Sequence, residues 1–201
     1  GGAAGVRADG RAWEDTQALV SEDEERFGPI ETFLNNAGVT GQLVRGRFDE
    51  PTIAEVNPDT WETVVDTNLS GIFRCSKAVL PGMLDRGHGR LIHLSSGMGL
   101  SGKAGWGPYV ASKHGVEGLA ETLALEVEGT GVESMTLRPP GGGVHTESRE
   151  DAGRTAEDST HRPDVVRAAA VALAAGEGEN GGRYVATPDG DGYESYEKSS
   201  R

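Results

Sequence analysis

The sequence is poor in several residue types that particular classes of protein need. It has one cysteine, Cys75, and so cannot form an internal disulfide bond. Lysine occurs only four times against 15 arginines, and the formal net charge is −13. No stretch approaches the roughly 18 consecutive apolar residues of a membrane-spanning helix. Because an acidic chain repels phosphate backbones and anionic lipids, we expect no nucleic-acid or membrane partner. The single cysteine and the lack of a signal-peptide pattern lead us to expect a reducing, cytoplasmic location.

Large apolar side chains are also scarce. Leu, Ile, Val and Phe together number 39 of 201 residues, which at this net charge would ordinarily indicate disorder. The 31 glycines bring the combined share of apolar residues and glycine close to the value usual for folded proteins. The apolar residues also fall in ordered runs, so we predict a folded chain. Many carboxylates with few lysines lead us to expect a halophilic protein, since high salt screens the self-repulsion.

Apolar runs alternate with amphipathic stretches along the chain. The pattern predicts helices over residues 12–27, 58–86, 109–128 and 162–175, strands over 30–34, 90–94, 134–137 and 183–186, and an irregular loop over 40–57. Strands that alternate with helices imply a parallel sheet covered on both faces. The expected fold is therefore a three-layer, Rossmann-like, doubly wound α/β domain, in which ligands bind at the carboxyl ends of the strands.

One pair of side chains on the third helix suggests proton transfer. Tyr109 and Lys113 are four residues apart, so both project from the same helix face. A free phenol has a pKa of about 10, which is too high for efficient acid–base chemistry near neutrality. A lysine ammonium nearby favours the phenolate and lowers that pKa. Taken alone, such a pair occurs in many helices as two solvated side chains.

Further motifs surround this pair in a fixed order. They are Asn35-Asn36-Ala37-Gly38, Asn68-Leu69-Ser70-Gly71, Ser95-Ser96-Gly97 and Tyr109-Val110-Ala111-Ser112-Lys113, followed by Pro140-Gly141 and Thr146 after the third strand. In this order and spacing, they resemble the short-chain dehydrogenase/reductase family. The resemblance runs from about Val6 to Gly190, nearly the whole chain.

The resemblance implies an oxidoreductase that uses NAD or NADP to interconvert an alcohol and a carbonyl, as 3-oxoacyl reductases do. Tyr109 is then the general acid/base, and Ser96 hydrogen-bonds and positions the substrate oxygen. Lys113 lowers the pKa of Tyr109 and touches the nicotinamide ribose, while Asn68 holds a water that passes protons toward Lys113. Two simpler roles stay open: Ser96 as a strand-end cap and Asn68 as a structural amide.

The resemblance also implies a set of cofactor-binding residues: Asp9, Asn36, Ala37, Gly38, Tyr109, Lys113, Pro140, Gly141 and Thr146. The turn at 35–38 lines the adenosine side, although it could equally serve only to hold neighbouring strands together. Asp9 stands where family members contact the adenine, but Gly10 follows it where the family usually has an apolar residue. The five histidines have no metal-ligand spacing, so we expect no metal site.

The family also carries a glycine-rich turn and two strands ahead of the segment at Asp9, roughly 50 residues at the length of a strand–helix–strand unit. The sequence instead begins at Gly1. We therefore expect a single domain over residues 1–190 that lacks its first two strands, followed by a polar tail over 191–201. The strand at 30–34 then becomes an open sheet edge. The residue that distinguishes NAD from NADP also falls in the missing region.

Two functions from different classes follow from this reading. The first is an active NAD(P)-dependent enzyme that acts on a small alcohol or carbonyl substrate. The second is a truncated, non-catalytic family member that binds cofactor poorly and acts as a structural subunit. In either case the helices at 58–86 and 109–128 resemble those with which the family associates, so we expect a homodimer or homotetramer.

Overall fold

The computed structural model describes residues 4–47, 49–141, 161 and 163–197. Its elements are the helices α1 (Trp13–Phe27), α2 (Gly41–Arg45), α3 (Pro58–Val65), α4 (Gly71–Arg86), α5 (Gly107–Glu126) and α7 (Arg167–Ala174), and the strands β1 (Thr32–Asn35), β2 (Gly89–Leu94), β3 (Val132–Arg138), β4 (Arg183–Ala186) and β5 (Tyr193–Ser195). A π-helical turn, Asp66–Ser70, joins α3 to α4, and short 3₁₀ turns lie at Gly97–Gly99 and Pro163–Val166.

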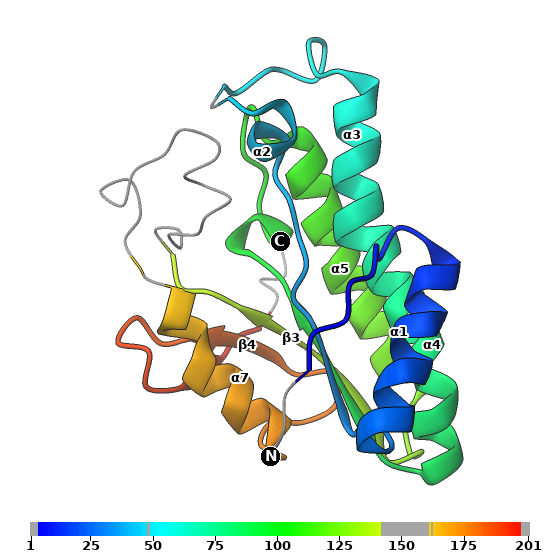
Figure 1. Ribbon diagram of the computed structural model, residues 1–201. Helices are drawn as coiled ribbons and strands as arrows, with labels where there is room; N and C mark the ends of the chain where they lie inside the picture. The colour runs from blue at the N-terminus through cyan, green and yellow to red at the C-terminus, as the bar shows by residue number, and fades with distance from the viewer. Residues whose placement is uncertain (1–3, 48, 142–160, 162, 198–201) are drawn as a thin grey trace.

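The five strands form one sheet in the order β1-β2-β3-β4-β5. The first three pairings are parallel, with Leu34 opposite Ile92 and Ile92 opposite Met135. Helices α4 and α5 cover one face, with α1 packed against α4, and α7 covers the other (Figure 1). This arrangement confirms the expected doubly wound α/β fold, and β1 forms the expected sheet edge in the described part of the chain.

Two apolar cores flank the sheet because successive strand residues point to opposite faces. On the α4–α5 face, Leu91 packs with Met83 and Val127, among others. On the α7 face, Ile92 packs with Met135 and Leu173, among others. The strands are thus buried on both sides, which is why they appear in the sequence as continuous apolar runs rather than alternating patterns.

The long helix predicted over residues 58–86 is interrupted by the π-helical turn. Pro58 occupies the first turn of α3, where its missing N–H costs nothing, and Asn57 caps that helix by accepting a hydrogen bond from the Asp59 N–H. The π turn inserts an extra residue in the helical repeat and places Asn68 fully inside the protein. Hydrophobic periodicity cannot show such an insertion, because the apolar face continues on both sides of it.

Two other predictions need correction. The stretch predicted as an irregular loop, 40–57, contains the short helix α2, whose first turn is capped by the Thr40 hydroxyl. The segment predicted as a polar tail, 191–201, contributes β5, which pairs antiparallel with β4. The sheet is therefore mixed rather than wholly parallel and extends past residue 190. Tyr193 packs its ring against Tyr184 at 5.0 Å, an apolar contact that the polar composition of this segment conceals.

Candidate active site

The side chains predicted to do chemistry gather at the carboxyl ends of β1, β2 and β3. Tyr109 and Lys113 both lie in the first half of α5, which packs against β3 and the 3₁₀ turn after β2. The Lys113 ammonium nitrogen is 5.8 Å from the centre of the Tyr109 ring. The Tyr109 ring also meets Trp106 edge-on at 6.0 Å, and the Trp106 indole donates a hydrogen bond to Glu50. The two residues therefore form one cluster, as their spacing predicts.

Lys113 is almost completely buried, with 4% of its surface exposed. Its Nζ donates a hydrogen bond of 2.6 Å to the Leu94 carbonyl at the end of β2. Burial lowers the pKa of Lys113 to about 8, and the carboxylate of Glu117, one helical turn along α5, opposes that shift. The hydrogen bond thus fixes the position of the amine, and burial lets it release its proton at a lower pH than a free lysine does.

Ser96 lies two residues after the end of β2 and immediately before the 3₁₀ turn Gly97–Gly99. Its Oγ accepts a hydrogen bond of 3.2 Å from the Met98 N–H, so it caps that turn. Within the described residues its own hydroxyl hydrogen has no acceptor. Ser96 is half-buried and can therefore donate this hydrogen to a bound molecule. The cap and the predicted substrate contact are compatible because they use different atoms of the same hydroxyl.

Asn68 connects the turn after β1 to α5. Its Oδ1 accepts from the Val39 N–H at 2.7 Å, and its Nδ2 donates to the Val39 carbonyl at 2.8 Å. The second Nδ2 hydrogen goes to Ser112 Oγ at 3.1 Å, and that hydroxyl donates in turn to the Tyr109 carbonyl. Both amide hydrogens are thus used in holding the site together. The structural role left open for this residue is realised, and a water relay would have to use Oδ1.

The turn at Asn36, Ala37 and Gly38 is exposed directly after β1. A β-carbon at Gly38 would lie 3.4 Å from Asn68 Oδ1 and 3.8 Å from Lys113 Nζ. Glycine therefore leaves the approach to the lysine amine open from this side.

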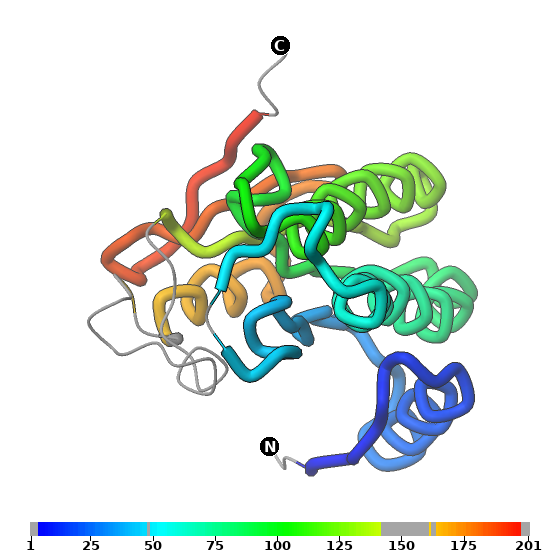
Figure 2. The backbone as a smooth tube through the Cα atoms, turned by 90° about the horizontal axis from the view of Figure 1, so that it is seen from above, coloured from blue at the N-terminus to red at the C-terminus, as the bar shows by residue number. Residues whose placement is uncertain are grey.

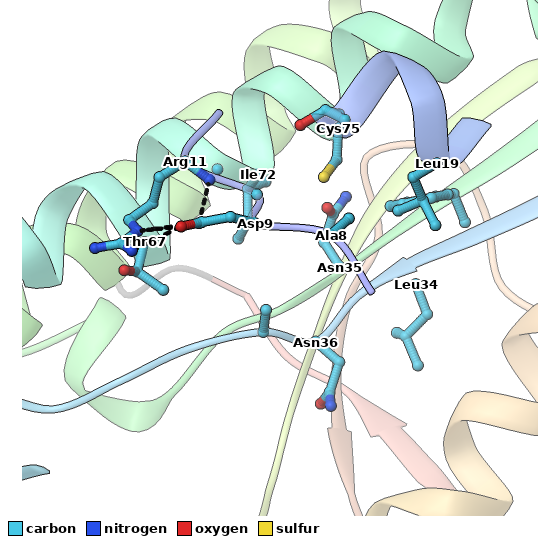
Figure 3. A pocket seen from close by; sticks show the side chains of 15 residues that line it. Ala8, Asp9, Arg11, Leu19, Leu34, Asn35, Asn36, Thr67, Ile72 and Cys75 are labelled. Atoms are coloured by element: carbon cyan, nitrogen blue, oxygen red, sulfur yellow. Dashed lines mark hydrogen bonds and ion pairs between the residues drawn. The ribbon is translucent and has the colours of Figure 1, made fainter. Parts of the chain in front are cut away.

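A cavity of about 240 Å³ lies beside this turn, between β1, α1, α4 and the segment at Asp9 (Figure 3). Asn36 and Ala37 line it, together with the apolar side chains of Leu34 and Ile72. Asp9 also lines it, but both of its oxygens are held by Arg11, at 2.7 and 3.0 Å for the shortest contacts. That hydrogen bonding lowers the pKa of Asp9 to about 2.

The remaining predicted residues lie at the end of β3 or beyond it. Pro140 is buried and Gly141 is exposed at the strand end, where the Gly141 carbonyl hydrogen-bonds with the ring of His161. Thr146 lies outside the described residues. In the part of the chain that the structure describes, no group of three or more His, Cys, Asp or Glu side chains could hold a metal ion.

Two residues of this region were missed by sequence reasoning. Glu117 is 1% exposed, and its carboxylate accepts from Thr136 Oγ1 and Arg183 Nε, both at 3.3 Å, and from the Tyr196 hydroxyl at 3.2 Å. It therefore ties α5 to β3, β4 and the residue after β5. Arg138 ends β3, directly before Pro139-Pro140, and its guanidinium lies 4.3 Å from the Tyr196 ring centre. Its position at a strand end was the one signal that could have identified it.

Comparison with known proteins adds a family to this geometry. Residues 1–157 match the family model described as short chain dehydrogenase. A 3-oxoacyl-acyl-carrier-protein reductase of Vibrio cholerae is 36% identical over 126 residues, which are 63% of this chain and 48% of that protein. The chain spans about half the length of the curated relatives it matches.

Two solved structures resemble this one. A gluconate 5-dehydrogenase from Burkholderia cenocepacia, in complex with NADP and tartrate, superposes with a TM-score of 0.75 at 26% identity, covering 88% of this chain and 71% of that one. A variant of an actinorhodin polyketide ketoreductase with NADPH has a TM-score of 0.61 at 38% identity, covering 69% of this chain and 50% of that one. None of the helices described here is long and apolar enough to cross a membrane.

Proposed function

This chain belongs to the short-chain dehydrogenase family, and from that premise we propose that it is an NAD(P)-dependent oxidoreductase that interconverts an alcohol and a carbonyl. The observation that supports the proposal most is the buried Lys113 amine beside the Tyr109 ring, fixed by the Leu94 carbonyl. If the pair were only two solvated side chains, both would be exposed, whereas Lys113 is 4% exposed. The named relatives are reductases and dehydrogenases, and the two similar structures hold NADP or NADPH.

In the direction of carbonyl reduction, Tyr109 donates its phenolic proton to the substrate oxygen. Ser96 donates a second hydrogen bond to the same oxygen, so two donors stabilise the charge that develops there. The Lys113 ammonium stabilises the phenolate that Tyr109 becomes. The nicotinamide cofactor, when bound, supplies the hydride. In the opposite direction each proton moves back along the same path.

The residues beside the cavity fit a dinucleotide. The cavity has apolar walls at Leu34 and Ile72, suited to one face of an adenine ring, and polar groups at Asn36 and Asp9. The two oxygens of the Asp9 carboxylate already accept four hydrogen bonds from Arg11, so a contact between Asp9 and the adenine would have to replace one of them. Gly38 leaves room next to Lys113 Nζ for the nicotinamide ribose, and Pro140 with Gly141 would border the nicotinamide.

Self-association in the cytoplasm is part of the same proposal. Helices α3, α4 and α5 carry exposed large apolar side chains, including Trp61 on α3, Phe73 and Leu84 on α4 and Leu125 on α5. Burying such side chains against a second copy removes apolar surface from water. The expected assembly is a homodimer or homotetramer.

The proposed activity predicts a defined loss in one variant. The chain should oxidise NADH or NADPH in the presence of ketones, and Tyr109→Phe, which removes only the hydroxyl, should lower kcat by about 10²–10⁴-fold. The measurement is the absorbance of the reduced nucleotide at pH 7 with a panel of ketones. The matched control is Tyr193→Phe, whose hydroxyl bonds Glu177 near the surface.

The same assay separates the two functions weighed from the sequence. Turnover that Tyr109→Phe abolishes and Tyr193→Phe preserves supports the enzyme. If no nucleotide is oxidised, or if Tyr109→Phe turns over as fast as the unchanged chain, the proposed mechanism is wrong and the structural-subunit alternative gains support.

A further inference from the structure

Arg138 is the last residue of β3, on the sheet face that α5 covers. Residues along a strand alternate between faces, and Thr136, two positions earlier, bonds Glu117 of α5. The side chain of Arg138 therefore points into the layer between β3 and α5, at the end of the sheet where Ser96, Tyr109 and Lys113 lie. It is half-buried.

No acidic side chain pairs with this arginine among the described residues, and its guanidinium makes no hydrogen bond there. The Nε atom is shielded from solvent and unpartnered. This is unusual in a chain with 32 acidic and 19 basic residues, where carboxylates are abundant. A buried polar group without a partner destabilises the folded state by about 1–3 kcal/mol, so its retention calls for a role.

Tyr196 holds the guanidinium without occupying its donors. The Arg138 Cζ lies 4.3 Å from the centre of the Tyr196 ring, a cation–π contact. The Tyr196 hydroxyl is fixed in turn by Glu117 at 3.2 Å. A guanidinium meets an aromatic ring through its charge and its face, whereas it binds carboxylates and phosphates through N–H groups in its plane. The contact therefore orients Arg138 and leaves its N–H groups for an anion.

The guanidinium also lies next to the residue that follows Ser96. A β-carbon at Gly97 would be 3.9 Å from Arg138 Nη1, and apart from the two adjacent residues no other heavy atom would lie within 4 Å of it. Gly97 is exposed and Arg138 beside it is half-buried. An anion bound by Arg138 would thus lie one residue from the hydroxyl proposed to hold the substrate oxygen.

We propose that Arg138 is a specificity-determining residue that binds an oxyanion, a carboxylate or a phosphate ester, carried by the carbonyl substrate. This inference rests on the proposed oxidoreductase function and narrows its substrates to anionic ones. Ser96 and Tyr109 bind the reacting oxygen while Arg138 binds the charged end. The carboxylate of Glu117 does not compete for Arg138, because it is bonded to Thr136, Arg183 and Tyr196.

The test is a titration of the free chain followed by NMR of the arginine Nε–H signals. The chain has 15 arginines, and the Arg138 signal is identified by its loss in Arg138→Lys. Acetoacetate is compared with its neutral methyl ester, and dihydroxyacetone phosphate with dihydroxyacetone. We expect at least one anion to shift the Arg138 signal and both neutral partners to leave it unchanged. The anion that acts at lower concentration shows whether the site prefers carboxylate or phosphate.

Three variants test the assignment. Measured by isothermal titration calorimetry, because the variant lacks the Arg138 signal, Arg138→Gln should weaken anion binding at least tenfold. Arg26→Gln, which removes the same charge from the exposed last turn of α1, should not. Gly97→Asp places a carboxylate beside Arg138 Nη1, at a position whose backbone angles suit any residue. This carboxylate should pair with the guanidinium and so prevent added anions from binding to it. This second route does not depend on whether Arg138→Gln folds.

The proposal is overturned if neither anion perturbs Arg138, or if the glutamine or aspartate variant binds as tightly as the unchanged chain. Because the titration uses neither nucleotide nor turnover, it can succeed in a chain that shows no reductase activity. Failure of the proposed function and failure of this inference are therefore distinguishable.

Discussion

Replacing Lys113 by methionine is expected to slow turnover about 10²–10⁴-fold while making the folded chain more stable. The loss of rate follows from removing the ammonium that lies 5.8 Å from the centre of the Tyr109 ring. Without the ammonium, the phenolate formed when Tyr109 gives up its proton loses the stabilisation of this positive charge.

The gain in stability follows from the direction of the Lys113 pKa shift. Burial lowers the pKa from 10.5 to about 8 in the folded chain. Below pH 8 the amine is charged in both the folded and the unfolded chain, so the cost of burying the ammonium lowers the free energy of unfolding in full. As the pH rises from 8 to 10.5 the folded chain buries a neutral amine instead, and this cost disappears. The shift corresponds to about 3 kcal/mol. Methionine has a similar volume and no charge, so the free energy of unfolding measured in urea at pH 7 should rise by up to about 3 kcal/mol. The lost hydrogen bond to the Leu94 carbonyl reduces this gain.

The control for this variant is Lys103→Met, which removes an exposed lysine. Lys103 lies 4.6 Å from the Trp106 ring and 3.8 Å from the Glu50 carboxylate, contacts of small value at a surface. It should leave the free energy of unfolding nearly unchanged. A Lys113→Met chain that keeps its rate, or that is clearly less stable than the unchanged chain, would contradict the role given to this amine.

Acid is expected to destabilise the fold through His93. This residue on β2 is 1% exposed, and burial lowers its pKa to about 4. Asn35 Nδ2 lies 3.2 Å from its Nδ1, and its Nε2 lies 3.3 Å from the hydroxyl of Ser134, which donates to the Ala120 carbonyl. With the amide donating to Nδ1, this chain of bonds requires the neutral imidazole with its hydrogen on Nε2.

The sign follows from the two pKa values. The unfolded histidine takes up a proton near pH 6.5 and the folded one near pH 4, so stability from this group falls as the pH drops between those values. The total loss is about 3 kcal/mol. Urea unfolding from pH 7 to 4 should show this slope, and His93→Gln should lack it, whereas His88→Gln, at an exposed position, should keep it. An imidazole of His93 that titrates near 6.5 by NMR would refute the prediction.

The sequence predicted the layers of the fold well because buried parallel strands leave a strong signal. Runs such as 90–94 are apolar on both sides, and the structure places them in β2 between two cores. Short or polar elements left no such signal. Helix α2 has five residues and β5 has three, and each is held by contacts from elsewhere in the chain rather than by its own pattern.

The site was predicted unevenly for a related reason. Tyr109 and Lys113 share a helix, so their spacing alone brings them together. Glu117 and Arg138 matter through partners that are distant in sequence, such as Tyr196, which is 79 residues from Glu117. No local pattern indicates that a glutamate inside a helix accepts three hydrogen bonds, or that an arginine at a strand end pairs with no carboxylate of the described residues. Those properties exist only after the strands are assembled.

The most direct test of the account is which atom of the Tyr109–Lys113 pair loses the first proton. Two coupled groups titrate as a unit, so the step near pH 8 could leave either a phenolate or a neutral amine. Tyrosine labelled at the ring carbon that bears the hydroxyl distinguishes them, since the chain has only four tyrosines. Burial raises the pKa of Tyr184, Tyr193 and Tyr196, the last to about 12. The account predicts that Tyr109 ionises first of the four and that Lys113→Met moves its ionisation to higher pH. A Tyr109 that stays a phenol to about pH 10, whether or not Lys113 is present, would contradict it.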